Sequence, residues 1–331
     1  MTLMVTIITG VTKSWNASSG KLTAGGQARL ILDQITKDLQ CAIFRSDGNT
    51  WMAADIVPDS QASTWVPSGQ KTASESDDPA AMRSSLTTNE KGAIANARFG
   101  VSGVWLRFFT NQPGTNTTGN LDSLSAPVAV SYRLLQGHVS SSTASTMRYM
   151  LYRAQVSPTE TFQKGYNIVD TSVYPTGSAP AASGTAQSIY YPALTDVLAE
   201  NVVDFGIRMY VKETIGGVTN LRLVFPAVAT TAQNPSPATG TLANLTSIGA
   251  SDTQTHHYSK SGTTDPNDYY ANTFPDVIEV MIRVLSDEGI QKLQLLDNPP
   301  AGYVPSETWW QIVEANSTVY TRRIEINAKA F

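Results

Sequence analysis

Residues 202–211 read VVDFGIRMYV, and this stretch decides the fold class. Its alternate positions are apolar, and the residues between them are mostly more polar; the apolar positions are Val203, Phe205, Ile207, Met209 and Val211. A period of two residues is typical of a β-strand with one face against a core and the other toward water. The stretch therefore predicts a strand of an antiparallel sheet with one covered face.

Six further stretches are rich in β-branched and aromatic residues and predict strands of the same kind. They cover residues 104–109, 128–135, 147–155, 221–227, 277–285 and 320–328. The other long stretches are rich in Ser, Thr, Gly and Pro, chiefly 46–95, 112–125, 171–188 and 228–273. The first of them could also hold one short strand. Such long loops are uncommon in compact domains, so we expect them at the surface. We expect one antiparallel sheet, formed mainly by the C-terminal half.

Two stretches predict helices. Between residues 27 and 44, apolar residues recur at steps of three and four, which predicts an amphipathic helix with one buried stripe. The stripe that would pack against the sheet consists of Ala28, Ile31, Leu32, Ile35, Leu39 and Ile43. A second, shorter helix is predicted to begin after Ser286, a capping residue followed by two acids, and to end before Pro299.

The first twelve residues carry no charge and are mostly apolar. As a helix they would extend roughly 18 Å, short of the ~30 Å hydrocarbon core of a bilayer. The first basic residue, Lys13, follows the apolar run, whereas a secretory signal has its basic residues before it. We interpret the segment as the last half of a membrane helix, with Trp15 at the membrane interface. The alternative is a buried strand or a short core helix.

Composition disfavours several functional classes. The 331 residues suit one or two domains, and Lys+Arg 23 against Asp+Glu 27 leaves a net charge of -4. That balance provides no excess of positive charge for nucleic acid. A single cysteine, Cys41, and three histidines leave little material for disulfides, thiolate metal sites or a catalytic triad. No phosphate-binding glycine loop or nucleophile elbow occurs. We therefore expect a protein that is not an enzyme.

The one cofactor candidate is calcium, which Asp265, Asn267 and Asp268 could bind through their side-chain oxygens. Their spacing lacks the central Gly and the terminal Glu of an EF-hand loop. A turn with local hydrogen bonds is the favoured interpretation, so we expect no cofactor.

Several stretches together resemble a known family. Thr12-Lys13-Ser14-Trp15 follows the apolar run, and ARLILDQITKDL occupies residues 28–39. Later come LAENVVDFGIR at 198–208, FPDVIEVMIRVLSD at 274–287 and TRRI at 321–324. The order resembles the type IV pilin-like proteins, in particular the J-type minor pseudopilins of type II secretion and the Verru_Chthon cassette protein C branch. The likeness covers the first 45 residues and about 190–331. The family's prepilin processing motif, Gly-Phe-Thr-Leu-Ile-Glu after a basic leader, is missing from this sequence.

The resemblance implies an α+β, pilin-like fold, with a long N-terminal helix packed on an antiparallel sheet. Residues 1–45 would form the helix, and 46–331 a β-rich periplasmic domain. It also implies a structural minor pseudopilin that helps to assemble the tip of a pseudopilus for protein export. The protein would cross the bacterial inner membrane once, with other minor pseudopilins and inner-membrane components of the secretion system as partners. The assembly helix would use Leu3, Ile7, Ile8, Gly10, Val11 and Trp15.

The main alternative is a secreted carbohydrate-binding or adhesin-like β domain. Three aromatic pairs could provide its sugar-stacking surface: Tyr190-Tyr191, Tyr269-Tyr270 and Trp309-Trp310.

Overall fold

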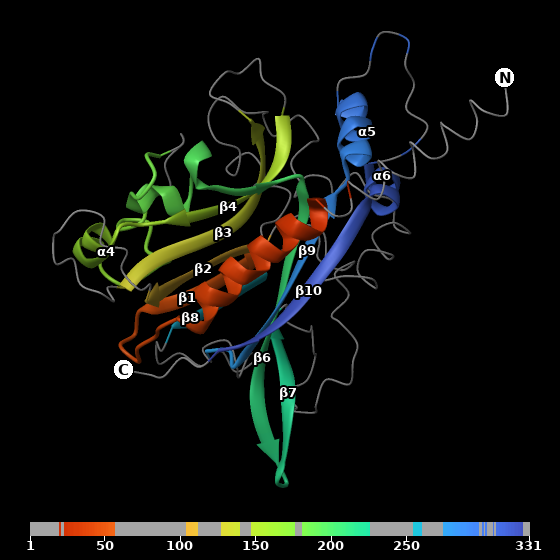
Figure 1. Cartoon of the computed structure of the whole chain (residues 1–331). Coiled ribbons are helices and arrows are strands. Elements are labelled where there is room, and N and C mark those ends of the chain that lie inside the picture. Colours follow the sequence, from red (N-terminus) through yellow and green to blue (C-terminus); the bar gives the residue numbers. More distant parts are fainter. Residues whose placement is uncertain are drawn as a thin grey trace, which may run out of the picture.

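A computed structural model shows a protein built mainly of β-strands (Figure 1). It describes residues 20, 23–56, 104–111, 127–139, 147–175, 181–225, 254–259, 274–297, 300, 302, 307 and 309–326. The described strands form two antiparallel sheets, one of six strands and one of four.

The six-stranded sheet has the order β5-β4-β3-β2-β1-β8. Its strands are β1 (Thr50–Ile56), β2 (Val104–Asn111), β3 (Pro127–His138), β4 (Met147–Gln155), β5 (Val197–Glu200) and β8 (Gln254–Ser259). The four-stranded sheet has the order β10-β9-β6-β7. It contains β6 (Val202–Ile215), β7 (Val218–Phe225), β9 (Val277–Leu285) and β10 (Ser317–Glu325).

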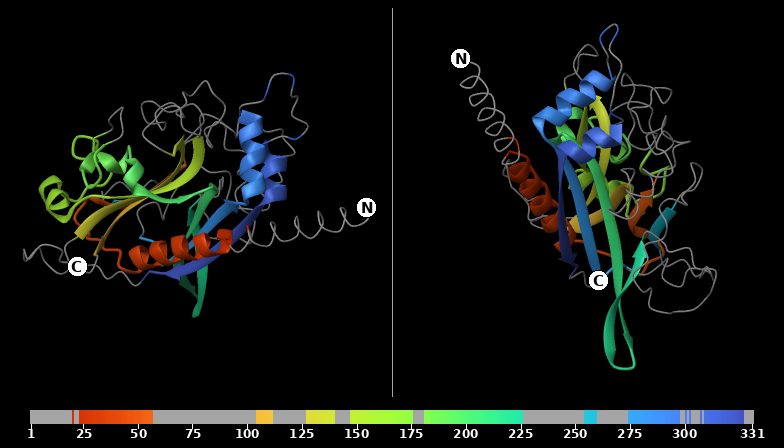
Figure 2. Two further views of the ribbon diagram at one scale, coloured as in Figure 1. Left: turned by 45° about the horizontal axis from the view of Figure 1, so that its top comes forward. Right: turned by 90° about the vertical axis from the view of Figure 1, so that its right-hand side faces the viewer.

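The described helices are short apart from one. The N-terminal helix, residues 23–40, lies beside β10 across the sheets (Figures 1 and 2). Between β4 and β5 lie α4 (Pro158–Lys164) and the 3-10 helices η2 (Ala186–Ile189) and η3 (Leu194–Asp196). Helices α5 (Asp287–Asp297) and α6 (Trp309–Asn316) form a separate pair at one end of the four-stranded sheet. They enclose a small second core with Tyr149, Val203 and Leu285.

The expected α+β fold, a long helix packed on one antiparallel sheet, is wrong. The described chain is mostly β, with two sheets and a helix of residues 23–40 as its main helical element. The physical reason is the amount of apolar surface. Seven of the eight β2 residues are buried, from Val104 to Thr110, so both faces of this strand are covered. A helix of about 27 Å covers only a strip of such a sheet, and the second sheet covers more of it.

The main core therefore has two layers. On one face of the six-stranded sheet, Tyr132 of β3 lies 6.4 Å from Phe205 of β6, centroid to centroid, so the two sheets meet there. On the other face, Trp51 and Phe109 pack against Tyr166, which belongs to the connection between β4 and β5. The strand 202–211 also differs from the sequence prediction, because Asp204 on its polar side is only 2% exposed.

All seven predicted strands overlap strands of the structure. Strand β1 is the one short strand that 46–95 could hold, whereas β5 and β8, which fall beside or within stretches assigned to loops, were missed. Trp309 and Trp310, one of the aromatic pairs of the sugar-binding alternative, begin α6. Ser286 does cap the following helix, because its hydroxyl accepts a hydrogen bond from the Gly289 N–H at 3.3 Å.

The N-terminal helix is shorter at its C-terminal end than the sequence pattern predicts. It ends at residue 40, and Ala42 then forms an antiparallel bridge with Thr110 of β2. The Ile43 N–H donates to the Phe109 carbonyl at 3.0 Å, so Ile43 is buried from an extended segment rather than from a helix. Among the helices described, none is long and apolar enough to cross a membrane.

Candidate functional site

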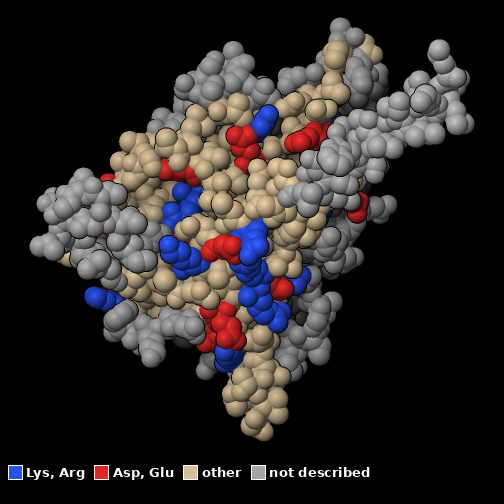
Figure 3. All heavy atoms as spheres, viewed as in Figure 1, with Lys and Arg blue, Asp and Glu red and all other residues tan. Residues whose placement is uncertain are grey.

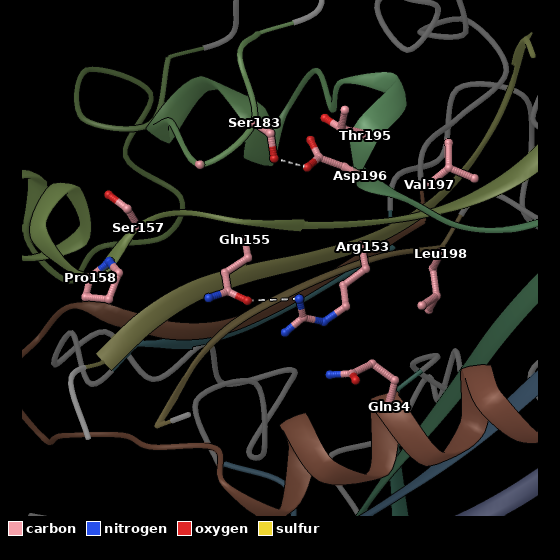
Figure 4. Close-up of a pocket in the computed structure, with 11 residues that line it drawn as sticks. Gln34, Arg153, Gln155, Ser157, Pro158, Ser183, Thr195, Asp196, Val197 and Leu198 are labelled. Atoms are coloured by element: carbon pink, nitrogen blue, oxygen red, sulfur yellow. Dashed lines mark hydrogen bonds between the residues drawn. The ribbon is translucent and has the colours of Figure 1, made fainter. Parts of the chain in front are cut away.

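A polar hollow on the described surface lies between the N-terminal helix and the segment 181–198 (Figure 4). We call it the β4 groove. It has a volume of about 540 Å³. Its lining residues are Gln34, Arg153, Gln155, Ser157, Pro158, Ser183, Gly184, Thr195, Asp196, Val197 and Leu198. Strand β4 forms the floor, the helix one wall and the segment before β5 the other.

The floor of the β4 groove is built on a buried ion pair. Arg153 binds Asp38 of the N-terminal helix with two contacts, Nε to Oδ2 at 2.7 Å and Nη2 to Oδ1 at 3.1 Å. The Asp38 side chain has no exposed surface, and that of Arg153 is 14% exposed. The hydroxyl of Tyr132 also donates to Asp38, and Gln34 donates to it at 3.0 Å. Such bidentate, charge-assisted contacts fix orientation as well as distance.

The pKa shifts in this cluster follow from burial and from Asp38. Burial raises the pKa of the Tyr132 phenol well above its usual value of 10, and the neighbouring carboxylate of Asp38 raises it further. Burial, the largest single effect, would lower the pKa of Arg153, but the hydrogen bonds and charges of Asp38 and Tyr132 together outweigh it, so the pKa is raised. Tyr132 therefore stays protonated and Arg153 stays charged, and neither group is suited to exchange a proton near neutral pH.

Several other polar groups of the groove are also held by protein partners. Nη1 of Arg153 donates to the Gln155 side-chain oxygen at 2.9 Å. Ser183 donates to Asp196, which also accepts from the Ala193 N–H at 2.9 Å. Figure 4 shows Gln34 and Gln155 on either side of Arg153. A ligand here would meet amides, hydroxyls and apolar side chains, because the guanidinium charge is already balanced by Asp38.

A second buried polar centre lies on the opposite face of the six-stranded sheet. Arg107 of β2 forms an ion pair with Asp55 of β1, and its guanidinium lies 3.8 Å from the ring centroid of Trp105. Tyr190 packs edge-on against Trp105 at 4.7 Å. Burial lowers the pKa of Arg107 to about 10, which leaves it charged at neutral pH. Arg133 is the second guanidinium beside Trp105, at 5.3 Å. These contacts join β1, β2 and β3 to the segment that covers them.

Sequence reasoning missed both buried centres. Asp38, Arg153, Asp55 and Arg107 come from four separate segments, and each is an ordinary polar residue in its local pattern. The only usable signal was composition: charged residues make up just 15% of the chain, yet several fall inside predicted strands. A charge at an inward strand position needs a partner, because an unpaired buried charge is costly.

The structure places the predicted helix stripe in the main core. Ala28, Ile31, Ile35 and Leu39 have no exposed surface, and Leu32 is 5% exposed. On the opposite face of the helix, Leu30 is 59% exposed. The predicted membrane residues from Leu3 to Trp15 lie outside the described residues. So do the calcium candidates Asp265, Asn267 and Asp268. Among the residues that the structure describes, no cluster of His, Cys, Asp and Glu could hold a metal ion.

The structure describes the side chains of only one of the three aromatic pairs that the sugar-binding alternative would use. Tyr191 is 8% exposed, and Tyr190 packs on Trp105, so this pair forms no open stacking platform. Tyr269-Tyr270 and the side chains of Trp309-Trp310 lie outside what the structure describes.

The charged residues on the helical side of the molecule are mixed in sign. Figure 3 shows acidic and basic side chains next to one another over the N-terminal helix and β10. Asp33 of the helix binds Arg322 of β10 at 2.5 Å and lies 3.8 Å from Arg29. A surface of this kind supplies neither the positive stripe of a nucleic-acid site nor a strong field for a charged substrate.

Comparisons with known proteins return no relative. No family model matches the sequence, and no curated protein or solved structure matches it either.

Proposed function

We propose that this protein is a structural assembly subunit, a minor pseudopilin of a type II secretion or type IV pilus-like machine, anchored in the inner membrane with its β-rich body in the periplasm. Support comes from the N-terminal part of the chain rather than from the architecture of the sheets. The observation that carries the proposal is the way the N-terminal helix is tied to the body.

Four strands hold that helix. Its buried stripe enters the main core, Asp38 binds Tyr132 of β3 and Arg153 of β4, and Asp33 binds Arg322 of β10. The Thr110 hydroxyl of β2 also donates to the Asp38 carbonyl at 2.8 Å. A load applied to the helix would therefore be transmitted to both sheets. In the sequence, the uncharged segment 1–12 precedes this helix. A body that is tied to the helix in this way suits a subunit on which force is exerted through a membrane-embedded N-terminal segment.

The buried charges also favour a structural role. Asp38 with Arg153, and Asp55 with Arg107, join separate elements, and each charge is balanced by its partner. Among the described residues, these clusters contain no nucleophile held by a general base, which catalysis by acyl transfer would require.

Cell fractionation tests the membrane anchor. Expressed from its own gene in its native host, the wild-type protein is expected in the inner-membrane fraction, with the body accessible to protease only after the outer membrane is opened. Ile8→Lys places a charge in the apolar segment at a cost of about 2.5–3.5 kcal/mol, so the variant should shift to the soluble fraction. Thr12→Lys, beside Lys13, is the matched control and should stay in the membrane.

Cross-linking tests the assembly role. A photoreactive residue in place of Leu30, on the exposed helix face, should give adducts with other pilin-like subunits. The same residue in place of Phe162, which is 75% exposed on α4, serves as the control position. A wild-type protein released in soluble form, or equal adducts from both positions, would contradict the proposal.

A further inference from the structure

The hairpin of β6 and β7 extends beyond the four-stranded sheet. Strand β6 pairs with β9 only as far as Tyr210 opposite Val277, but it pairs with β7 up to Ile215 opposite Val218. Residues 211–215 and 218–222 thus form a two-stranded ribbon, which we call the β6–β7 arm. Figures 1 and 2 show the arm projecting away from the body.

A tight turn fixes the register of the arm. Gly216 and Gly217 connect the strands, with φ angles of 60° and 82°. Positive φ at both central residues is the signature of a type I′ turn, whose twist matches that of a hairpin. In such a turn the N–H of Val218 donates back to the carbonyl of Ile215. Backbone groups alternate along a strand, so those of Thr219 and Leu221 point away from β6, toward the outer edge.

The tip of the arm, from Thr214 to Leu221, exposes uncharged and partly apolar surface. Val218 is 60% exposed and Leu221 is 40% exposed, and Thr219 and Asn220 between them are exposed as well. From Thr214 to Leu221 the sequence carries no charge and no proline. Natural proteins usually protect an edge strand with charges, proline or a cover. Among the described strands, β7 lies at one end of its sheet, and along residues 218–221 it carries neither a charge nor a proline.

We propose that the outer edge of β7 pairs with β7 of a second copy of this chain. The strands would run antiparallel about a two-fold axis at Leu221, and one sheet would continue across both copies. This inference goes beyond the function proposed above and does not depend on it.

We choose a second copy of the chain as the partner because the backbone groups along the outer edge of β7 are complementary to those of the same edge in another copy. In an antiparallel pair about a two-fold axis, each outward N–H meets an outward carbonyl of the same strand in the other copy. The register at Leu221 places Thr219 opposite residue 223 and Asn220 opposite residue 222. Position 222, where β7 has its charged residue, is then paired with position 220, an asparagine, rather than with position 222 of the other copy. No like charges oppose each other, so the repulsion that normally prevents edge pairing is missing.

The contact is small and therefore weak. Pairing of two short strands falls below the size of a standard interface, so we expect a dissociation constant of about 10–100 μM. Subunits held side by side by a membrane or a filament reach effective concentrations of about 1 mM, at which such a contact would be occupied.

Sedimentation velocity over a range of concentrations tests the pairing. The wild-type chain should shift from monomer to dimer as its concentration passes about 10–100 μM. Thr219→Pro removes an outward N–H and spares the β6–β7 ladder, so this variant should stay monomeric. Thr219→Val keeps the N–H and a β-branched side chain, and should dimerise like the wild type.

A second variant tests the pairing independently, in case Thr219→Pro does not fold. Leu221→Lys keeps every backbone group and sets two positive charges against each other at the two-fold axis, so it should also stay monomeric. In the wild type, amide exchange at Thr219 and Leu221 should slow as concentration rises. A wild type that remains monomeric throughout, or a dimer that persists in both Thr219→Pro and Leu221→Lys, would overturn the inference.

Discussion

At the scale of single residues, the position of Asp38 shows how a buried charge joins separate segments. In the helix pattern it is one of several polar residues between apolar ones, like Asp33 one turn earlier. The two differ in the fold, because Asp38 is 1% exposed and bound by Arg153, whereas the Asp33 side chain is 57% exposed. Burial raises the cost of losing one partner, since the other charge is then left uncompensated in the interior.

Asp38→Ala should therefore lower the free energy of unfolding by about 3–5 kcal/mol, because the mostly buried Arg153 guanidinium is left without its counter-ion. Asp33→Ala removes an exposed carboxylate from the same helix and should cost less than about 1 kcal/mol. Urea unfolding followed by circular dichroism measures both. Equal losses for the two variants would show that the Asp38–Arg153 pair is not specially important to stability.

At the scale of elements, two glycines in helices have opposite roles. Gly289 lies where α5 meets α6, and a Cβ there would be 2.8 Å from the Cβ of Asn316 and 3.0 Å from Cδ2 of Leu285. Gly26 lies in the N-terminal helix, and a Cβ there would meet nothing within 4 Å. The close approach of α5 to α6 thus needs glycine, whereas the N-terminal helix does not.

Gly289→Ala should destabilise the α5–α6 pair by about 1–3 kcal/mol, because Asn316 and Leu285 must shift to admit the methyl group. Hydrogen exchange should rise in α5 and α6 and stay unchanged in β2 and β3, which belong to the main core. Gly26→Ala is the matched variant and should stabilise the protein by about 0.5–1 kcal/mol through helix propensity. Unchanged exchange in α5 and α6 would mean that the contact at Gly289 is not tight.

At the scale of the whole molecule, Tyr132 lies where the two sheets and the N-terminal helix meet. Its ring is near Phe205 of the other sheet, and its hydroxyl donates to Asp38 of the helix. Because burial and Asp38 raise its pKa, the folded protein keeps this phenol protonated at a pH where the unfolded chain has released the proton. The folded state then binds more protons than the unfolded state, so this group makes stability fall as pH rises above about 10.

Arg107 acts in the opposite direction over the same range. Its pKa is lowered to about 10 in the folded protein, so above that pH the unfolded chain binds more protons at this position. The effect of Tyr132 must therefore be measured as a difference between two proteins that both retain Arg107.

Tyr132→Phe should have a less negative slope of unfolding free energy against pH than the wild type, between about pH 9 and 11. The difference should approach about 1.4 kcal/mol per pH unit, the value for one proton. Denaturant unfolding at a series of pH values measures it, and the lower stability of the variant at neutral pH does not affect the slope. Parallel slopes for the two proteins would contradict the assignment to Tyr132.

The sequence by itself determined the local features of this protein. The period of two residues in 202–211 and the β-branched residues of 277–285 predicted strands that the structure contains. The steps of three and four after residue 27 predicted a helix with a buried stripe. The sequence also predicted that Ser286 caps the helix that follows it. These features depend on neighbours within a few residues, so local patterns are sufficient to find them.

Only the tertiary structure decided how the strands divide into two sheets, and it overturned the pilin-like arrangement. Strand β1 pairs with β2 and β8, which lie far along the chain, and no local pattern records such a pairing. The Asp38–Arg153 pair arises in the same way, since Asp38 and Arg153 are 115 positions apart in the sequence. The β4 groove, whose floor contains this pair, also depends on such long-range contacts. A buried ion pair needs only that two charges meet in the folded chain, and that meeting is fixed by the packing of whole elements rather than by the sequence around either residue.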